Sequence, residues 1–286
     1  MGHELDLAEH KSWIGRTRVA TDTVTPRLLR SFEAALKPHL AVGETGVPPG
    51  FHWCLAPDIV EHAKLGHDGH PAKGEFLPLI PLPRRMWAGG SLVFHSQIRE
   101  GDSIERRSTI AAIEEKQGRT GPLCFVTVRH EISTPRGAAI EEVQSIVYRS
   151  PESVGSAGGS NERSGTPKPA PVADHVREVS IDSVVLFRYS AVTFNGHRIH
   201  YDAPYAIETE HYSGLVVHGP LQATYLLNFA TTLAGRTPAR FSFRGLAPAA
   251  GVESIVLNAG GASERAMELW VTDPEGRITM SGEAAW

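Results

Sequence analysis

The pattern of apolar and polar positions is dominated by long runs rich in β-branched and other apolar residues, separated by turn residues. Such runs are typical of β-strands. In the first half of the chain they predict strands at residues 91–98, 103–114, 123–133 and 139–149. In the second half they predict strands at residues 180–192, 240–246, 252–259, 266–272 and 277–284. Strands that follow one another this closely favour an antiparallel sheet, and its apolar face needs a cover.

Two segments with helical spacing of apolar residues would supply this cover. Residues 25–40 begin with Thr25 as a candidate N-cap and Pro26 at the first helical position. Residues 221–234 are apolar almost all round, which is typical of a fully enclosed helix, and Gly235 is a natural stop. We therefore expect an α+β protein in which each half is one helix wrapped by an antiparallel sheet.

A central polar segment separates the two halves. Residues 150–174 are rich in Ser, Gly and Pro and contain few large apolar side chains, so they are expected to form a linker or a long loop. The predicted organisation is therefore a first domain at 1–150, a linker at 151–174 and a second domain at 175–286. A Pro-x-Gly hairpin at 134–137 and another at 273–276 follow corresponding strands, which indicates an internal duplication.

Composition narrows the class of protein. The chain has 286 residues, of which 41% are hydrophobic, so it can bury a core and is neither disordered nor collagenous. The net charge of −4 argues against a nucleic-acid partner. With only Cys54 and Cys124, a disulfide framework is not expected. The charged N-terminal residues and the lack of long apolar runs predict no signal peptide, no membrane contact and a cytoplasmic location.

Candidate chemistry concentrates just before the second predicted helix. Four of the 14 histidines lie close together there, at positions 197, 200, 211 and 218. A polar cluster beside the start of an enclosed helix is a place where a pocket with shifted pKa values is expected. The tripeptide His218-Gly219-Pro220 adds a second element, because a backbone N–H at a helix start can stabilise an oxyanion. Gly219 would let a substrate oxygen approach closely, or it could simply serve a tight loop.

These residues resemble the hydratase motif of the MaoC-like enoyl-thioester hydratases. Ile199-His200-Tyr201-Asp202 matches the end of that motif, and Val217-His218-Gly219 matches the helix start that follows it. Asn195 stands where the family has its catalytic aspartate. Phe-Asn-x-His-Arg-Ile-His-Tyr-Asp at 194–202 and the segment 76–90 resemble the hydroxyacyl-thioester dehydratase type 2 branch, which includes 3-methylfumaryl-CoA (mesaconyl-C4-CoA) and itaconyl-CoA hydratases.

The resemblance implies a double hot-dog fold with a catalytically degenerate first half that supports acyl and CoA binding. It also implies a hydro-lyase that adds water to an α,β-unsaturated, short branched or dicarboxylic acyl-CoA. His200 is expected to be the acid/base, because imidazole titrates near working pH. Gly219 would bind the oxyanion, and Asn195 would orient water or position His200. Asp202 would orient His200 or satisfy a local turn.

Further residues are predicted to line the substrate site. Around the motif these are His197, Arg198, Asp202, Val217 and His218, and Arg198 is the candidate partner of a substrate carboxylate. In the first half, Trp87 and Gly89 belong to a segment that would line the acyl pocket or reach a CoA phosphate, or would simply be a loop anchored by Trp87.

Several alternatives remain open at this point. The chain could be a dehydratase for acyl-carrier-protein substrates, a thioesterase on the same fold, or a thioester-binding subunit without activity, which Asn195 would favour. His197 and His200 with His211 or Asp202 could bind a metal, but we expect no metal and no cofactor, CoA being part of the substrate. A homodimer is compatible with exposed sheet edges.

Overall fold

The computed structural model describes residues 8–118, 121–150 and 171–286. The first half contains α1 (Ala8–Lys11), β1 (Thr17–Thr23), α2 (Pro26–Leu36), the short 3-10 helices η1 (Phe51–Cys54) and η2 (His62–Lys64), β2 (Arg84–Phe94), β3 (Ser103–Gly118), β4 (Gly121–Thr134) and β5 (Gly137–Arg149). The second half contains β6 (His175–Ser180), α3 (Ser183–Thr193), the 3-10 turn η4 (Arg198–His200), the π turn η5 (Tyr205–Thr209), α4 (Gly219–Ala234), β7 (Arg240–Gly245), β8 (Ser254–Gly260), β9 (Ala266–Thr272) and β10 (Ile278–Ala285).

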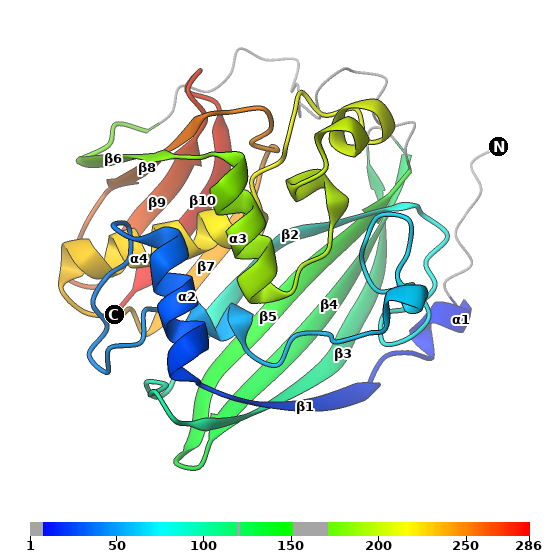
Figure 1. The fold of residues 1–286 in the computed structure, drawn as a ribbon, viewed down its shortest axis with the longest axis horizontal. Coiled ribbons are helices and arrows are strands. Elements are labelled where there is room, and N and C mark those ends of the chain that lie inside the picture. Colours follow the sequence, from blue (N-terminus) through cyan, green and yellow to red (C-terminus); the bar gives the residue numbers. More distant parts are fainter. Residues whose placement is uncertain (1–7, 119–120, 151–170) are drawn as a thin grey trace.

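The strands form one antiparallel sheet in the order β1-β3-β4-β5-β2-β7-β10-β9-β8-β6 (Figure 1). Read inward from each edge, the first half has the order β1-β3-β4-β5-β2 and the second half has β6-β8-β9-β10-β7. The two orders are equivalent, which agrees with the predicted duplication. The halves join where β2 pairs with β7, from Gly89 opposite Arg244 to Val93 opposite Arg240. The predicted α+β double hot-dog architecture is confirmed.

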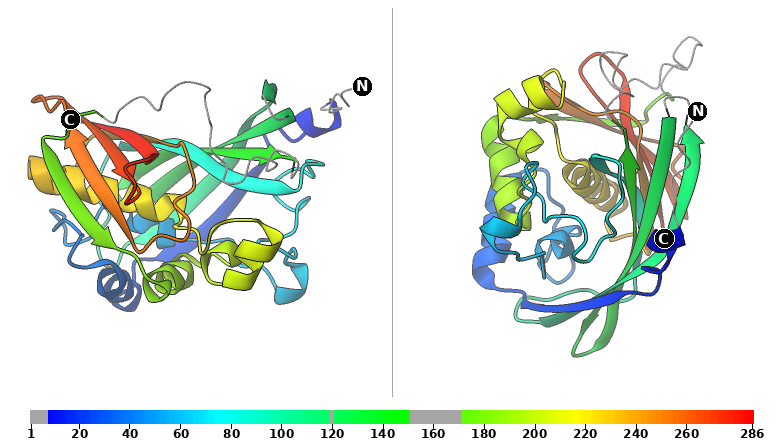
Figure 2. Two further views of the ribbon diagram at one scale, coloured as in Figure 1. Left: turned by 90° about the horizontal axis from the view of Figure 1, so that it is seen from above. Right: turned by 90° about the vertical axis from the view of Figure 1, so that its right-hand side faces the viewer.

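Helix α4 lies against the sheet of the second half. It packs on β8, β9 and β10, and Figure 2 shows it end-on inside the curve of the sheet. Its side chains from Leu221 to Thr231 are all buried, as the apolar sequence predicts. It ends at Gly235, which adopts a left-handed conformation (φ 70°) as the C-cap. The enclosed helix predicted at 221–234 is therefore confirmed, and it begins two residues earlier.

The first half is covered differently. Helix α2 is capped as predicted, since the N–H of Leu28 donates to Oγ1 of Thr25 at 3.2 Å. It packs against α3 and η1, beside which it lies in Figure 1. The strands β3, β4 and β5 are instead covered by an irregular segment whose side chains at 76, 80 and 82 pack in the second apolar cluster. The expectation that each half wraps one helix thus describes α4 but not α2.

Three boundaries differ from the sequence-based expectation. The strand predicted at 180–192 is wrong: this segment forms α3, because Asp182 accepts a hydrogen bond from the N–H of Val185 and caps a helix despite the β-branched residues. The strand predicted at 91–98 is β2, which begins at Arg84 and ends at Phe94. The helix predicted at 25–40 ends at Leu36, where the following Lys37-Pro38 cannot continue it.

Two further expectations concern the chain as a whole. Most of the predicted linker at 151–174 falls outside the described residues, and the strand β6 begins directly after it at His175. Among the described helices, none combines the length and the apolarity needed to cross a membrane.

Candidate active site

The motif around His200 is placed by the end of α3. Phe194 adopts a left-handed conformation (φ 53°) and ends the helix. The side-chain oxygen of Asn195 then accepts a hydrogen bond from the N–H of His197 at 3.0 Å, which forms a tight turn. The short helix η4 follows and ends at His200. The local sequence therefore brings the rings of His197 and His200 together, with centroids 5.5 Å apart.

His200 is a buried imidazole with a defined tautomer. Its Nδ1 lies 2.7 Å from the carbonyl oxygen of Val216. A carbonyl can only accept, so Nδ1 carries the proton and Nε2 keeps its lone pair. Burial lowers the pKa of His200 to about 3, although the hydrogen bond to Val216 opposes this shift. The ring is therefore neutral at pH 7 and presents a proton acceptor at Nε2.

The start of α4 lies next to this ring. His218 is the N-cap residue of α4, and its ring stacks on that of His200 with centroids 3.6 Å apart. Its Nε2 is held by the hydroxyl of Ser190 at 2.8 Å. Burial lowers the pKa of His218 well below the usual value, so it too is neutral. Gly219 follows as the first residue of α4, and its N–H belongs to the positive end of a long buried helix.

A fourth imidazole reaches the site from the first half of the chain. The ring of His70 lies 4.1 Å from that of His197, centroid to centroid. Its Nδ1 is 3.0 Å from Oδ2 of Asp68. Burial lowers the pKa of His70, and the hydrogen bond from Nδ1 to Asp68 partly offsets this effect. The carboxylate and the four rings of residues 70, 197, 200 and 218 thus form one continuous cluster.

The loop that carries His70 is docked tightly on the second half. The N–H of Arg198 donates to the carbonyl of Asp68 at 2.9 Å. Gly69 and Gly196 touch through their backbones: a Cβ added at Gly196 would lie 2.5 Å from the carbonyl oxygen of Gly69. The sequence analysis missed Asp68 and His70. A signal was present, because three histidines and an aspartate cluster at 62–70, but nothing in the sequence alone shows that this loop reaches η4.

The contacts of Asp202 and Arg198 do not agree with two of the roles considered for them. Asp202 accepts from the N–H of Tyr205 at 3.1 Å and binds the guanidinium of Arg198 at 2.7 Å, so it satisfies the local turn and does not orient His200. Arg198 also donates to the carbonyl of His67 and lies over the ring of Tyr205, 4.1 Å from its centroid. Its charge is therefore already neutralised, which disfavours the predicted role as partner of a substrate carboxylate.

The remaining predicted site residues lie around the start of α4. Trp87 packs beside Gly219, since a Cβ at Gly219 would lie 3.7 Å from its ring, and its buried indole N–H has no acceptor among the described residues. Gly89 sits where β2 passes β7 so closely that a Cβ would lie 2.5 Å from the carbonyl oxygen of Phe243. Val217 is buried in the main core. Residues 84–90, considered as a loop, form the first part of β2.

The metal hypothesis on His211 or Asp202 finds no support in the geometry, because neither residue joins the cluster. Within the described part of the chain, the side chains whose ligand atoms converge, within 4.8 Å of one another, are those of Asp68, His70 and His197. The hydrogen bond between Asp68 and Nδ1 of His70 is typical of a carboxylate that orients an imidazole and stabilises its charged form. The expectation of no metal and no cofactor stays a prediction.

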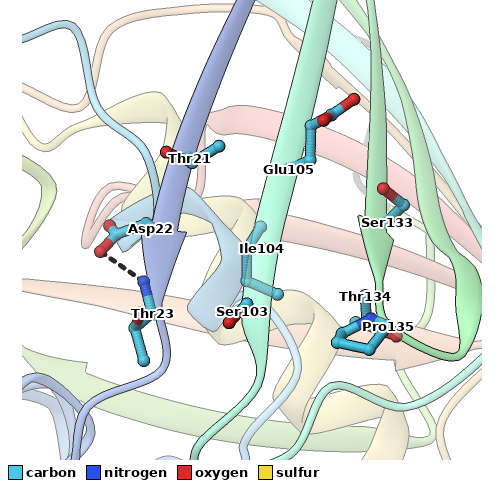
Figure 3. Close-up of a pocket in the computed structure, with 9 residues that line it drawn as sticks. All are labelled: Thr21, Asp22, Thr23, Ser103, Ile104, Glu105, Ser133, Thr134 and Pro135. Carbon is cyan, nitrogen blue, oxygen red and sulfur yellow. Dashed lines mark hydrogen bonds between the residues drawn. The ribbon is translucent and has the colours of Figure 1, made fainter.

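Two of the hollows on the described surface are relevant to the site. One, of about 540 Å³, lies where β1, β3 and β4 meet, and Figure 3 shows its lining of hydroxyls, two carboxylates, Ile104 and Pro135. Its lining contains no histidine, lysine or arginine, so it offers no acid/base group near pH 7. The other hollow, of about 390 Å³, is mostly apolar and adjoins the histidine cluster through Ser190 and Asn195.

Comparison with known proteins assigns the family. The sequence profile of hydroxyacyl-thioester dehydratase type 2 matches residues 50–251. The chain is 39% identical to mesaconyl-C(4)-CoA hydratase of Chloroflexus aurantiacus, over 97% of this chain and 98% of the relative. It is 25% identical to the mitochondrial hydroxyacyl-thioester dehydratase type 2 of Schizosaccharomyces pombe, over 81% of this chain and 86% of the relative.

Solved structures agree on the fold. A MaoC-like dehydratase from Phytophthora capsici aligns with a TM-score of 0.68 at 13% identity, covering 99% of both chains. HtdX of Mycobacterium tuberculosis aligns with a TM-score of 0.66 at 17% identity, covering 95% of this chain and all of the other. Together with the sequence matches, they establish that this protein is a hydro-lyase of acyl thioesters and that it belongs to the hydroxyacyl-thioester dehydratase type 2 family.

Proposed function

We propose that the protein hydrates a dicarboxylic acyl-CoA of the mesaconyl-C4 type, in reversible equilibrium with the 3-hydroxyacyl-CoA. The 39% identity to mesaconyl-C(4)-CoA hydratase over nearly the whole chain supports this substrate class. The observation that carries the proposal is the neutral ring of His200, stacked 3.6 Å from the N-cap residue of α4. It places a proton acceptor and an oxyanion-binding helix start side by side.

The proposed reaction follows from these two groups. Nε2 of His200 takes a proton from water as the water oxygen bonds to the β-carbon. The electron pair of the double bond moves toward the thioester carbonyl and forms an enolate oxyanion. The N–H of Gly219, reinforced by the dipole of α4, stabilises this charge, and one such donor is typically worth about 3–4 kcal/mol. A proton then reaches the α-carbon, so that one water is added and no proton is gained or lost.

Asn195 has a positioning role in this proposal. An amide cannot take a proton from water. Its oxygen is already used by the N–H of His197 at 3.0 Å, which fixes the turn before η4. Asn195 therefore determines where His197 and His200 lie, and it also lines the apolar hollow of about 390 Å³ in which we place part of the acyl thioester.

A second feature supports a dicarboxylic substrate. A mesaconyl thioester keeps a free carboxylate on the carbon that water attacks, and this charge needs a cation close to the acid/base group. Arg84 is engaged with Glu210 at 3.1 Å and Arg198 with Asp202. Arg85, by contrast, makes a long 3.5 Å contact to the carbonyl of Pro71, and its charge acts on His70 and His197. We therefore assign the substrate carboxylate to Arg85.

The test is a substrate screen with purified protein. Mesaconyl-C4-CoA, itaconyl-CoA and crotonyl-CoA are compared by the loss of the conjugated-thioester absorbance, with free thiol measured in parallel. Hydration of mesaconyl-C4-CoA with the thioester intact is the expected result. Release of free thiol would show a thioesterase instead, and a strong preference for an acyl-carrier-protein substrate would overturn the CoA assignment. Arg85→Gln is expected to slow mesaconyl-C4-CoA more than crotonyl-CoA, whereas Arg99→Gln is the surface control.

We also propose a cytoplasmic location and a homodimer. The sheet ends in β1 and β6, whose outer edges are free of a further strand among the described residues and could pair with a second copy. Cell fractionation and light scattering of the purified protein test these two statements. A monomer at all accessible concentrations would contradict the dimer.

A further inference from the structure

We propose that Asp68 and His70, from the half of the chain expected to be catalytically degenerate, form a second acid/base pair of the hydratase site, and that His70 delivers the proton to the α-carbon. This inference rests on the proposed function and adds a group to the same site. Neither residue belongs to the hydratase motif of the second half, and the similarity to the relatives gives neither residue a role.

The geometry provides the pair. The 3.0 Å hydrogen bond from Nδ1 of His70 to Asp68 fixes the ring and leaves Nε2 as the nitrogen that can exchange a proton. The side chains of His70 and Asp68 keep 23% and 21% of their surface exposed, so a substrate can reach them. His197 lies between His70 and His200, with centroids 4.1 Å from the first and 5.5 Å from the second.

The charge distribution explains why a second group is needed. A proton taken up by His200 creates a cation in a buried place, beside the rings of His197 and His218 and with a backbone carbonyl as the partner of Nδ1. Among the hydrogen bonds of the described residues, none joins His200 to a carboxylate. His70 has Asp68 at 3.0 Å, and this carboxylate stabilises a transient imidazolium. The proton is therefore better held on His70 than on His200.

The proton balance is closed within one turnover. Water loses a proton to Nε2 of His200 while its oxygen bonds to the β-carbon. The proton passes through His197 to Nε2 of His70, where Asp68 balances the positive charge. The enolate then takes this proton at the α-carbon, the carbon–oxygen double bond of the thioester is restored, and all imidazoles are neutral again. No oxidant, reductant or additional reactant is required.

The test compares three single variants of the full chain with mesaconyl-C4-CoA. We expect His70→Gln and Asp68→Asn to lower kcat by about 10²-fold or more, as for loss of an acid/base group, with KM little changed. Asp68→Asn keeps an oxygen that can accept from Nδ1 of His70 but removes the charge, so it tests the carboxylate and not the fold. His67→Gln, an exposed residue of the same loop, is the control and should retain full activity.

Two measurements separate this inference from a structural role and from failure of the proposed function. Added imidazole should restore activity to His70→Ala, which a merely misfolded variant would not show. Wild-type-like kcat in folded His70→Gln would overturn the inference while leaving the hydratase intact. A stoichiometric divalent metal ion, whose removal by a chelator abolishes activity, would also overturn it in favour of a metal site on the same side chains. Inactivity of the wild-type protein toward every enoyl-CoA would instead refute the proposed function.

Discussion

The two halves of the molecule have equivalent strand orders but different covers. In the second half, α4 fills the curve of the sheet and buries eleven side chains. In the first half, strands β3, β4 and β5 are covered instead by irregular backbone, with Phe76, Ile80 and Leu82 as its apolar contacts. A regular helix provides a fixed N-terminus for an oxyanion, and irregular backbone provides loops that can reach across to the other half.

Because of this difference, each half supplies different groups to the proposed site. The second half supplies a rigid helix start, with the ring of His200 stacked on that of the N-cap residue His218. The first half, which has no enclosed helix among its described residues, places the loop of Asp68 and His70 against the motif and Trp87 beside Gly219. The loss of the helix in one copy of a duplicated fold therefore need not mean the loss of its function.

The largest expected effect is that of removing the imidazole of His200, which the second half supplies. His200→Gln keeps a donor for the carbonyl of Val216 but removes the lone pair that accepts a proton. We expect kcat to fall by about 10³–10⁴-fold, at the upper end for a general acid/base group, with the fold intact. Steady-state hydration kinetics and circular dichroism check this. His175→Gln, an exposed position on β6, is the control, and equal activity in the two variants would remove His200 from the mechanism.

A pair of variants at the helix start tests whether α4 contributes to catalysis or only to packing. Gly219→Pro removes the N–H at a position where a helix tolerates proline, so we expect kcat to fall by about 10²–10³-fold. Gly219→Ala keeps the N–H, and its Cβ would meet Trp87 at an ordinary 3.7 Å, so activity should change little. Equal losses in both variants would show that the site needs space at this position and not the N–H.

The same comparison explains what sequence alone could predict. The strands β4, β5, β7 and β9 and the helix α4 were predictable because their burial patterns are local and continuous. The motif residues His200 and Gly219 could be proposed for the same reason, since they lie close together in the sequence. Helix α3 was mistaken for a strand because its β-branched residues outweighed one signal, the cap at Asp182.

The contribution of the first half could not be read from the sequence. Asp68 and Arg198 are joined by a backbone hydrogen bond across 130 positions, and no local pattern encodes such a contact. Arg198 was predicted to bind a substrate carboxylate, and only the structure shows that Asp202 already neutralises it. Partner choice among charged residues is decided by tertiary packing, which periodicity and spacing do not reveal.

A pair of glycine variants tests the docking of the first-half loop. Gly69 has φ 84°, and a Cβ there would collide with the carbonyl oxygen of Gly196. Gly74 has φ 96°, but a Cβ would meet nothing within 4 Å. In both alanine variants the positive φ should lower the free energy of unfolding by about 1 kcal/mol. Gly69→Ala should also displace the loop, which lowers the free energy of unfolding by roughly a further 1–2 kcal/mol.

The measurement for this pair is the free energy of unfolding in urea together with kcat. Gly69→Ala should lower both quantities, because the displaced loop carries His70 away from His197. Gly74→Ala should lower only the free energy of unfolding. If the two variants have the same kcat, the contact between the loop and η4 has no catalytic importance.

The smallest expected effect is on stability in mild acid, and it concerns both halves. Burial lowers the pKa of His52 in the first half to about 4 and that of His200 in the second half to about 3. Below pH 6.5 the unfolded chain binds protons that the folded chain excludes, so stability is full above pH 6.5 and falls as the pH drops toward 4. Each such histidine contributes a slope of at most about 1.4 kcal/mol per pH unit.

His52→Gln should therefore reduce the slope of unfolding free energy against pH by up to that amount near pH 5, whereas exposed His175→Gln should leave the slope unchanged. An unchanged slope in His52→Gln would mean that the acid sensitivity arises from the other buried histidines, whose pKa values burial also lowers, such as His130 and His200.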